Sequence, residues 1–406
     1  MITQEHIVRF CEKHDYDVRV SHNARWIDQK CAADVVSVIA DCILNYVLEN
    51  DDSFTVYDIW HYSYSVNCVE SLFKKPRVEE KQAKHEYDKF FAQPITLLAY
   101  AGVLSKVKQG KGFCYRIEDF EVLEYISIRE RNALFFLKTY IEKVLRDSGI
   151  YNKFEEFFAK QTQDAYQTVK EAFSTFTIHY TSINGKTECD RMFIKVLNPL
   201  AYYHNSCGTE RGKISKNPIT FDMLMYNRNN FRDIYANKPK GMTRKEYAET
   251  HQIPVNTDYY RYQSTKAKNL LRRFNVQFRN GRTEHLDNKH VLDNASHMHH
   301  IFPEAEFPEI CSYLENLIAL TPTQHLNYAH PNGKTQEISD QFQHLLLLSK
   351  ADRIRENLES LCGEIIYSFS DFLYVLCIGF DDKDILSITN MDFETVINTI
   401  NLHYSV

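Results

Sequence analysis

Residues 296–330 read SHMHHIFPEAEFPEICSYLENLIALTPTQHLNYAH, and this stretch decides how the rest of the chain is interpreted. From His297 to His330 it contains five histidines but no lysine or arginine. Imidazole is the commonest metal-binding side chain in proteins, and it exchanges protons near neutral pH. The stretch therefore predicts a metal-dependent catalytic site.

The same stretch predicts two strands and a helix. Residues 314–320, LENLIAL, have the apolar content of a strand, and the loop 303–313 is long enough for that strand to return antiparallel to the first. Thr321 is a good helix N-cap, and Pro322 suits the first helical position. His325 is then expected on the first turn of the helix.

These residues resemble the HNH, or ββα-metal, nuclease family. The family has a metal ligand beside a histidine base on a first strand, an asparagine on a second strand, and another ligand on the following helix. Here the matching residues are His299-His300, Asn316 and His325, with the family's nine-residue step in N-L-x-x-L-x-x-x-x-H. The resemblance implies that His300 is the general base and that His299 and His325 bind the metal. It also implies that Asn316 holds the loop behind the base through backbone hydrogen bonds.

The resemblance further implies a divalent cofactor and a set of products. We expect Mg²⁺, with Mn²⁺ or another divalent metal as alternatives, to stabilise charge on the phosphate and the leaving oxygen. The products would carry 5'-phosphate and 3'-hydroxyl ends.

The chain departs from the family pattern at several positions. Many members have Asp before the base, where this chain has a second histidine, as nuclease colicins do. Many carry a CxxC zinc knuckle, whose first positions are Thr321 and Gln324 here. The colicin position for a further ligand is Ala329. His330 and His297 remain candidates for a third ligand, although a surface position is the simpler interpretation of His297.

Length and composition indicate a soluble globular protein with two or three domains, because the chain has 406 residues, 44% hydrophobic and 25% charged. No apolar run is long enough to span a membrane, and the polar N-terminus lacks the apolar core of a secretory signal. We therefore expect a cytoplasmic protein. The ten cysteines form no CxxC pair, which favours free, mostly buried thiols over disulfides or a cysteine-ligated zinc.

The charge is distributed unevenly. Residues 205–291 hold 17 Lys and Arg against 8 Asp and Glu, whereas residues 331–406 hold 5 against 12. A charged run is usually a solvated face, but this one is mixed with aromatics and precedes the histidines, which favours a nucleic-acid surface. For each residue alone, a solvated side chain or a surface salt bridge is the simpler interpretation. The candidate DNA-binding residues are Arg228, Asn229, Asn230, Arg232, Arg244, Lys245, Lys266, Lys268, Arg272 and Arg273.

The N-terminal region predicts helices followed by a basic hairpin. Residues 31–49 and 86–104 both have helical patterns, the second ending near Gly102. Residues 105–120, SKVKQGKGFCYRIEDF, predict two short strands around a Gly-Lys-Gly turn. This order resembles a winged helix-turn-helix domain, which implies a helix in the major groove and a wing on the DNA backbone. A helical domain with a surface hairpin is an equally open alternative.

The sequence thus predicts an α+β, mostly helical chain with three regions. They are a winged-helix-like DNA-binding domain over 1–125, a helical and then basic DNA-recognition region over 126–284, and an HNH nuclease domain with C-terminal helices over 285–406. One nuclease unit behind a long DNA-binding region resembles HNH-class type II restriction endonucleases, among which the type IIS members fit best. The resemblance implies double-stranded DNA as substrate, a cognate DNA methyltransferase as functional partner, and action as a monomer or transient dimer.

Two alternatives stay open. One is another HNH nuclease of defence or mobile elements, including an enzyme restricted to modified DNA. The other is a non-catalytic DNA-binding regulator whose histidines hold a structural metal. Other nuclease motifs are weaker, because Glu79-x-Lys81 lacks a strand context and Asp190 with Lys195 is mis-spaced for the PD-(D/E)xK type.

Overall fold

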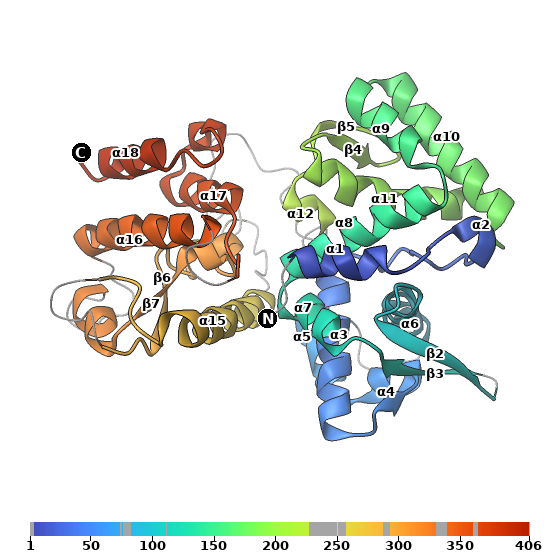
Figure 1. The fold of residues 1–406 in the computed structure, drawn as a ribbon, viewed down its shortest axis with the longest axis horizontal. Helices are drawn as coiled ribbons and strands as arrows, with labels where there is room; N and C mark the ends of the chain where they lie inside the picture. Colours follow the sequence, from blue (N-terminus) through green and yellow to red (C-terminus); the bar gives the residue numbers. More distant parts are fainter. Residues whose placement is uncertain are drawn as a thin grey trace. The chain divides into compact units, whose positions relative to one another are not determined.

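The computed structural model is an α+β fold that is mostly helical, as expected (Figure 1). It describes residues 4–73, 75, 83–110, 112–226, 250, 257–286, 293–329, 339–359 and 364–405. Within these ranges the strands form three small antiparallel sheets. The chain divides into two compact units, Met1–Val255 and Asn256–Val406.

This division does not follow the domain boundaries expected at 125/126 and 284/285. Helix α7 (Phe120–Ile128) packs on both α3 (Ala33–Glu49) and α8 (Glu130–Asp147), so its apolar side chains join the two sides of the first expected boundary. Helix α15 (Thr257–Arg279) packs on the strands that carry the paired histidines, and it therefore belongs with them. Charge composition placed α15 with the preceding basic residues, whereas its buried apolar face decides its partners.

The first half of the N-terminal unit contains helices around a three-stranded sheet. Besides α3, its elements are α1 (Gln4–Glu12), α2 (Val18–Ser21), β1 (Ser53–Phe54), α4 (Val56–His61), α5 (Ser63–Phe73), α6 (Ala83–Tyr100), β2 (Leu104–Gln109) and β3 (Gly112–Ile117). The sheet order is β1-β3-β2, with every pair antiparallel.

The predicted helices and hairpin of this half are present. The apolar face expected in residues 31–49 is buried in α3, where Val35, Val38 and Ile39 are inaccessible to solvent. Gly102 follows α6 with a φ of +82°, a left-handed conformation that favours glycine and ends the helix. β2 and β3 then pair as expected, with Leu104 opposite Ile117.

The second half of the N-terminal unit is a helical layer with a small hairpin. Its elements after α8 are α9 (Tyr151–Lys160), α10 (Gln163–Tyr180), α11 (Lys186–Tyr203), β4 (Cys207–Glu210), β5 (Lys213–Pro218) and α12 (Phe221–Leu224). The β4-β5 hairpin turns through Arg211 and Gly212, with φ of 51° and 77°. This hairpin was not predicted, because its strands lie in a stretch that was interpreted by charge alone.

The C-terminal unit places a two-stranded sheet among helices (Figure 1). Its strands are β6 (His297–His300) and β7 (Leu317–Leu320), and its helices are α15, α16 (Asp340–Leu358), α17 (Phe369–Phe380) and α18 (Phe393–His403). Helix α15 packs on both strands, and α16 packs on α18.

Two further expectations concern membranes and cysteines. None of the helices in the described ranges combines the length and apolar character needed to cross a membrane. The nine cysteines that fall in the described ranges are free thiols. Seven of them are buried, which agrees with the expectation of mostly buried thiols.

Candidate active site

The candidate site begins with the short sheet of β6 and β7. In its antiparallel register His299 lies opposite Ile318, and His300 lies opposite Leu317. Successive strand side chains point to opposite faces, so His297 and His299 share one face while His300 lies on the other. The paired histidines therefore enter two different environments.

One face of β6 brings three imidazoles together. The ring of His325 lies 4.6 Å from that of His297, nearly parallel to it, and 5.2 Å from that of His299, nearly perpendicular to it. His299 is only 4% exposed. The ring of His297 is half-buried, because the strand register places it against His325 at the edge of the unit's surface.

The three histidines differ in how well they suit a metal ion. Within the part of the chain that the structure describes, no three His, Cys, Asp or Glu side chains are already arranged to hold one. Parallel stacking keeps the His297 ring beside His325, and the two would have to turn to reach one ion. His299 and His325 supply two imidazoles, a donor type that suits divalent transition metals. These two residues fit a site that water or substrate oxygens would complete.

The helix that carries His325 begins as predicted but continues differently. The Thr321 hydroxyl accepts a hydrogen bond from Gln324 N, while the Gln324 side-chain oxygen accepts one from Thr321 N, each at 3.1 Å. This reciprocal pair is a capping box. The next residues, Gln324–Ala329, form a π-helix rather than the expected α-helix. Thr283 and the carbonyl of His285 also bind Gln324, so its buried amide ties the helix start to the segment after α15.

The other face of β6 buries His300 against α15 and the loop between the strands. His300 Nε2 lies 3.0 Å from the carbonyl of Cys311, which can only accept, so this nitrogen carries a proton. The lone pair is then on Nδ1, which lies 3.8 Å from Glu304 Oε2. Burial, helped by the positive charge of Lys268, lowers the pKa of His300 to about 4. The imidazole is consequently neutral at physiological pH.

Asn316 makes the backbone hydrogen bonds that the resemblance implied. Its Oδ1 accepts from Phe302 N at 2.8 Å, and its Nδ2 donates to the carbonyls of Phe302 and Ile310 at 3.0 and 3.3 Å. The side chain is fully buried, and it closes the loop that follows His300. β7 starts at Leu317 rather than at residue 314, because Leu314–Asn316 form a 3₁₀ turn that aims Asn316 into the loop.

Sequence reasoning missed three side chains that surround this loop. Ser264, on α15, lies 3.2 Å from His300 Nε2 and donates to Glu304 Oε2 at 3.2 Å. Gln343, on α16, donates to the carbonyl of Ile301 at 2.7 Å. Glu304 was detectable as the acid that directly follows the HHIFP motif. The other two come from distant helices, and no local pattern marks them.

A buried ionic network supports the far edge of β7. Glu284 is 1% exposed, and its carboxylate accepts a hydrogen bond from Ala319 N at 2.7 Å. Arg279, Lys350 and Tyr367 also contact this carboxylate. The cations lower the pKa of Glu284 despite its burial. The network fixes the strand whose partner carries the histidines.

The candidate DNA-binding residues divide into two groups. On α15, Arg272 and Arg273 are exposed, while Lys266 and Lys268 are half-buried. Lys266 bonds the Tyr262 hydroxyl at 3.2 Å. The remaining predicted residues lie outside the described residues, and so does the proposed ligand His330; they are Arg228, Asn229, Asn230, Arg232, Arg244 and Lys245.

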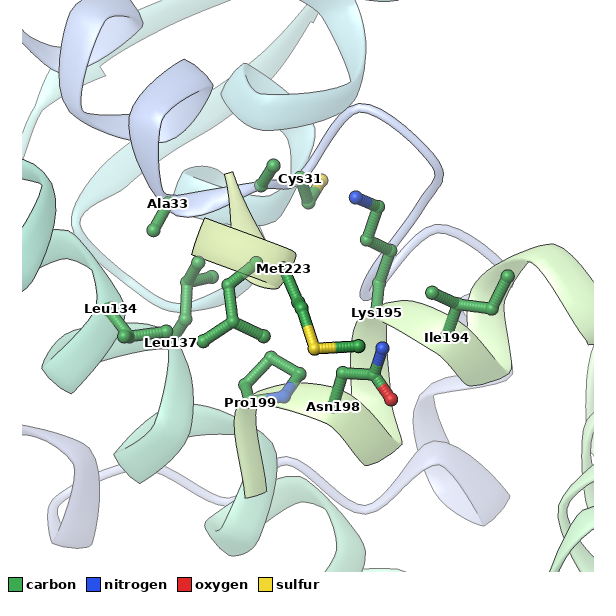
Figure 2. A pocket seen from close by; sticks show the side chains of 11 residues that line it. Cys31, Ala33, Leu134, Leu137, Ile194, Lys195, Asn198, Pro199 and Met223 are labelled. Carbon is green, nitrogen blue, oxygen red and sulfur yellow. The ribbon is translucent and has the colours of Figure 1, made fainter. Parts of the chain in front are cut away.

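The N-terminal unit has a small cavity that is separate from the histidine cluster (Figure 2). Its volume is about 30 Å³, which leaves room for only a few water molecules. Lys195 and Cys31 lie at its edge among mostly apolar side chains. The cavity is too small for a nucleotide or a metal-bound substrate, and we assign it no function.

Comparison with known proteins found no family model that matches this chain, and no similar curated protein or solved structure. The candidate site is therefore defined by its own residues.

Proposed function

We propose that this chain is a sequence-specific double-stranded DNA endonuclease of the HNH type, a type II restriction enzyme with a type IIS arrangement. The observation that carries the proposal is the placement of the histidines on the two faces of β6. His299 meets His325 on one face, whereas His300 is held on the other face beside a loop closed by Asn316. Phosphodiester hydrolysis needs a base, a cation and a fixed distance between them, and these four residues supply the protein's share.

His300 is the proposed general base. The carbonyl of Cys311 holds the proton on Nε2, so Nδ1 is the atom that can accept a proton from the attacking water. The low pKa keeps this nitrogen available across the physiological range. Asn316 holds the backbone on both sides of the loop, which fixes the direction of the His300 ring.

His299 and His325 are the proposed metal ligands. A bound divalent ion, with Mg²⁺ and Mn²⁺ as the first candidates, would stabilise negative charge on the phosphate and on the leaving oxygen. The products would then carry 5'-phosphate and 3'-hydroxyl ends. His297 stacks on His325 and orients it in this arrangement.

The N-terminal unit is the proposed reader of DNA, in the manner of a winged helix. The sheet order β1-β3-β2, with α6 directly before the β2-β3 hairpin, supports this proposal. Lys106, Lys108 and Arg116 are exposed on the hairpin, and the Lys106 ammonium lies 4.0 Å from the centre of the Phe113 ring. A basic hairpin of this kind suits phosphate contacts.

The proposed biological role implies a functional partner and an assembly. A restriction enzyme requires a DNA methyltransferase that protects host DNA at the same site. One histidine site per chain must cut two strands, either in turn or through a transient dimer on DNA.

A second candidate function is a non-catalytic DNA-binding regulator with a structural metal. The burial of both His299 and His300, at 4% and 9% exposure, is the observation that favours it. The two functions differ in what His300 does, because a structural site would not need a neutral base.

The deciding experiment incubates the purified full chain with plasmid DNA and Mg²⁺ or Mn²⁺, and then with other divalent metals. We expect discrete fragments with the wild-type protein. The variant His300→Ala should lose cleavage by about 10²-fold or more while retaining DNA binding. The exposed His179 on α10 provides a matched control, since His179→Ala should leave both properties unchanged.

The outcomes separate the candidates. A smear of products would indicate a nuclease without sequence specificity. Absence of cleavage with every metal, or joint loss of folding and DNA binding in His300→Ala, would support the regulator. Sequencing of the fragment ends would give the recognition site and the cut offset.

A further inference from the structure

A row of cations follows one side of α15. Arg261 and Arg272 are exposed, and Lys268 lies between them and is half-buried. Separations of seven and four residues place these side chains on one helical face. Four residues advance about 6 Å along a helix, close to the roughly 7 Å that one DNA strand advances over two nucleotides.

The same side of α15 reaches the candidate base. Ser264 lies one turn before Lys268, and its hydroxyl is 3.2 Å from both His300 Nε2 and Glu304 Oε2. Residues four apart on a helix are neighbours, so Lys268 lies beside Ser264 on this side of α15, and its charge acts on His300. Partial burial lowers the pKa of Lys268, while Glu304 opposes that shift, which agrees with an ammonium held near this carboxylate.

We propose that Lys268 binds the reacting phosphate of DNA beside His300, and that Arg261 and Arg272 bind phosphates of the same strand along α15. This inference rests on the proposed nuclease function. It separates Lys268 from the other basic residues, because a partly desolvated ammonium is stronger at a developing negative charge than an exposed one.

Lys266 provides a comparison on the same helix. Its ammonium bonds the Tyr262 hydroxyl at 3.2 Å and lies 5.1 Å from the centre of that ring. Two residues correspond to a little over half a turn, so Lys266 and Lys268 point in different directions from α15. Lys266 is therefore expected to contribute to DNA affinity without contacting the reacting phosphate.

The test measures single-turnover cleavage of plasmid DNA by the full chain with Mn²⁺. We expect Lys268→Ala to lower the rate constant at saturating protein by about 10²-fold. Lys268→Arg should recover much of that rate, because it restores the positive charge. Lys266→Ala should weaken binding, and it should lower the saturating rate much less than Lys268→Ala does. The matched control is Lys383→Ala, at an exposed lysine in the same unit, which should change neither the binding nor the saturating rate.

A second measurement keeps the inference independent of catalysis. DNA binding is measured over a range of salt concentrations in the His300→Ala background, with and without Lys268→Ala. Loss of one phosphate contact should reduce the slope of log affinity against log salt by about 0.9. If no variant cleaves DNA but this slope still falls, the nuclease proposal fails while the phosphate contact stands.

Two results would overturn the inference. One is a Lys268→Ala protein that cuts at the wild-type saturating rate. The other is a pattern in which Lys268→Arg cleaves as slowly as Lys268→Ala and the slope of log affinity against log salt is unchanged. That pattern would indicate that Lys268 only packs against its neighbours and does not bind a phosphate.

Discussion

At the scale of single residues, the atoms around His300 determine its tautomer and its pKa. Its Nε2 proton is directed to the Cys311 carbonyl, with the Ser264 hydroxyl nearby, so only Nδ1 can change protonation state. Burial opposes the charged form strongly enough to bring the pKa to about 4. Such an imidazole is a weaker base than a free histidine, but near neutral pH it stays unprotonated and can accept a proton.

This pKa predicts how stability depends on pH. In the unfolded chain His300 should titrate near 6.5, whereas in the folded chain it titrates near 4. Between these values the unfolded chain binds a proton that the folded chain lacks, so the free energy of unfolding falls as the pH falls. We expect His300 to account for a loss of about 2 kcal/mol between pH 7 and pH 5.

The measurement is urea unfolding at both pH values in the presence of a chelator, for wild type and His300→Gln. The variant should be less sensitive to pH by that amount. An identical pH dependence in the two proteins would show that His300 is not buried in its neutral form.

Residues inside a local pattern could be predicted, and residues contributed by distant helices could not. The positions of His299, Asn316 and His325 relative to the strands follow from short-range spacing, which the sequence displays. Ser264 contacts His300 only because α15 packs on β6, a contact that depends on the whole unit. The stacking of His297 on His325 was not predicted, because it requires the strand register as well as the position of the following helix.

At the scale of secondary structure elements, β7 is supported by the buried carboxylate of Glu284. Its contacts with Arg279 and Lys350 are largely shielded from solvent, unlike the pair formed by Arg355 and Asp352 on α16. Removing one partner of a buried pair leaves the other charge uncompensated, whereas an exposed pair is largely screened by water.

We therefore expect Glu284→Gln to lower the free energy of unfolding by about 3–5 kcal/mol. Asp352→Asn, which breaks the exposed pair, should cost less than about 1 kcal/mol. Urea unfolding at pH 7 measures both. The double variant Glu284→Gln/Lys350→Met should cost less than the sum of its single changes, and strict additivity would argue against a coupled network.

Elements with a clear period or turn signal were predicted well. The helical pattern of residues 31–49 and the Gly-Lys-Gly hairpin correspond to α3 and to β2 with β3. The 3₁₀ turn of Leu314–Asn316 and the π-helix of Gln324–Ala329 were not predicted. Both depend on side chains that hydrogen-bond to backbone outside their own turn, which apolar spacing does not reveal.

At the scale of the whole molecule, the proposed function assigns DNA recognition to one unit and DNA cleavage to the other. The basic hairpin belongs to Met1–Val255, whereas the histidine cluster and α15 belong to Asn256–Val406. Apolar spacing, turn signals and the histidine motif predicted a mostly helical α+β chain, but charge composition did not predict this boundary. The reason is that net charge does not report which apolar faces pack together.

A fragment of residues 256–406 should therefore fold by itself. We expect a helical circular dichroism spectrum and one cooperative urea transition, because α15 to α18 and the sheet form one compact unit. The fragment should lack sequence-specific DNA binding, which a gel shift against the full chain would measure. A fragment that is unfolded in isolation would contradict the two-unit description.

The capping of the helix at Gln324 has a consequence for how the protein is assembled. Many members of the HNH family, which this stretch resembles in sequence, carry a zinc knuckle around the second strand. Here Thr283, Thr321 and the His285 carbonyl are connected through one amide side chain. In the proposed nuclease, folding and loading with a catalytic ion would thus be separate events. In that proposed enzyme, a chelator should abolish cleavage without unfolding the C-terminal unit, and added metal should restore cleavage.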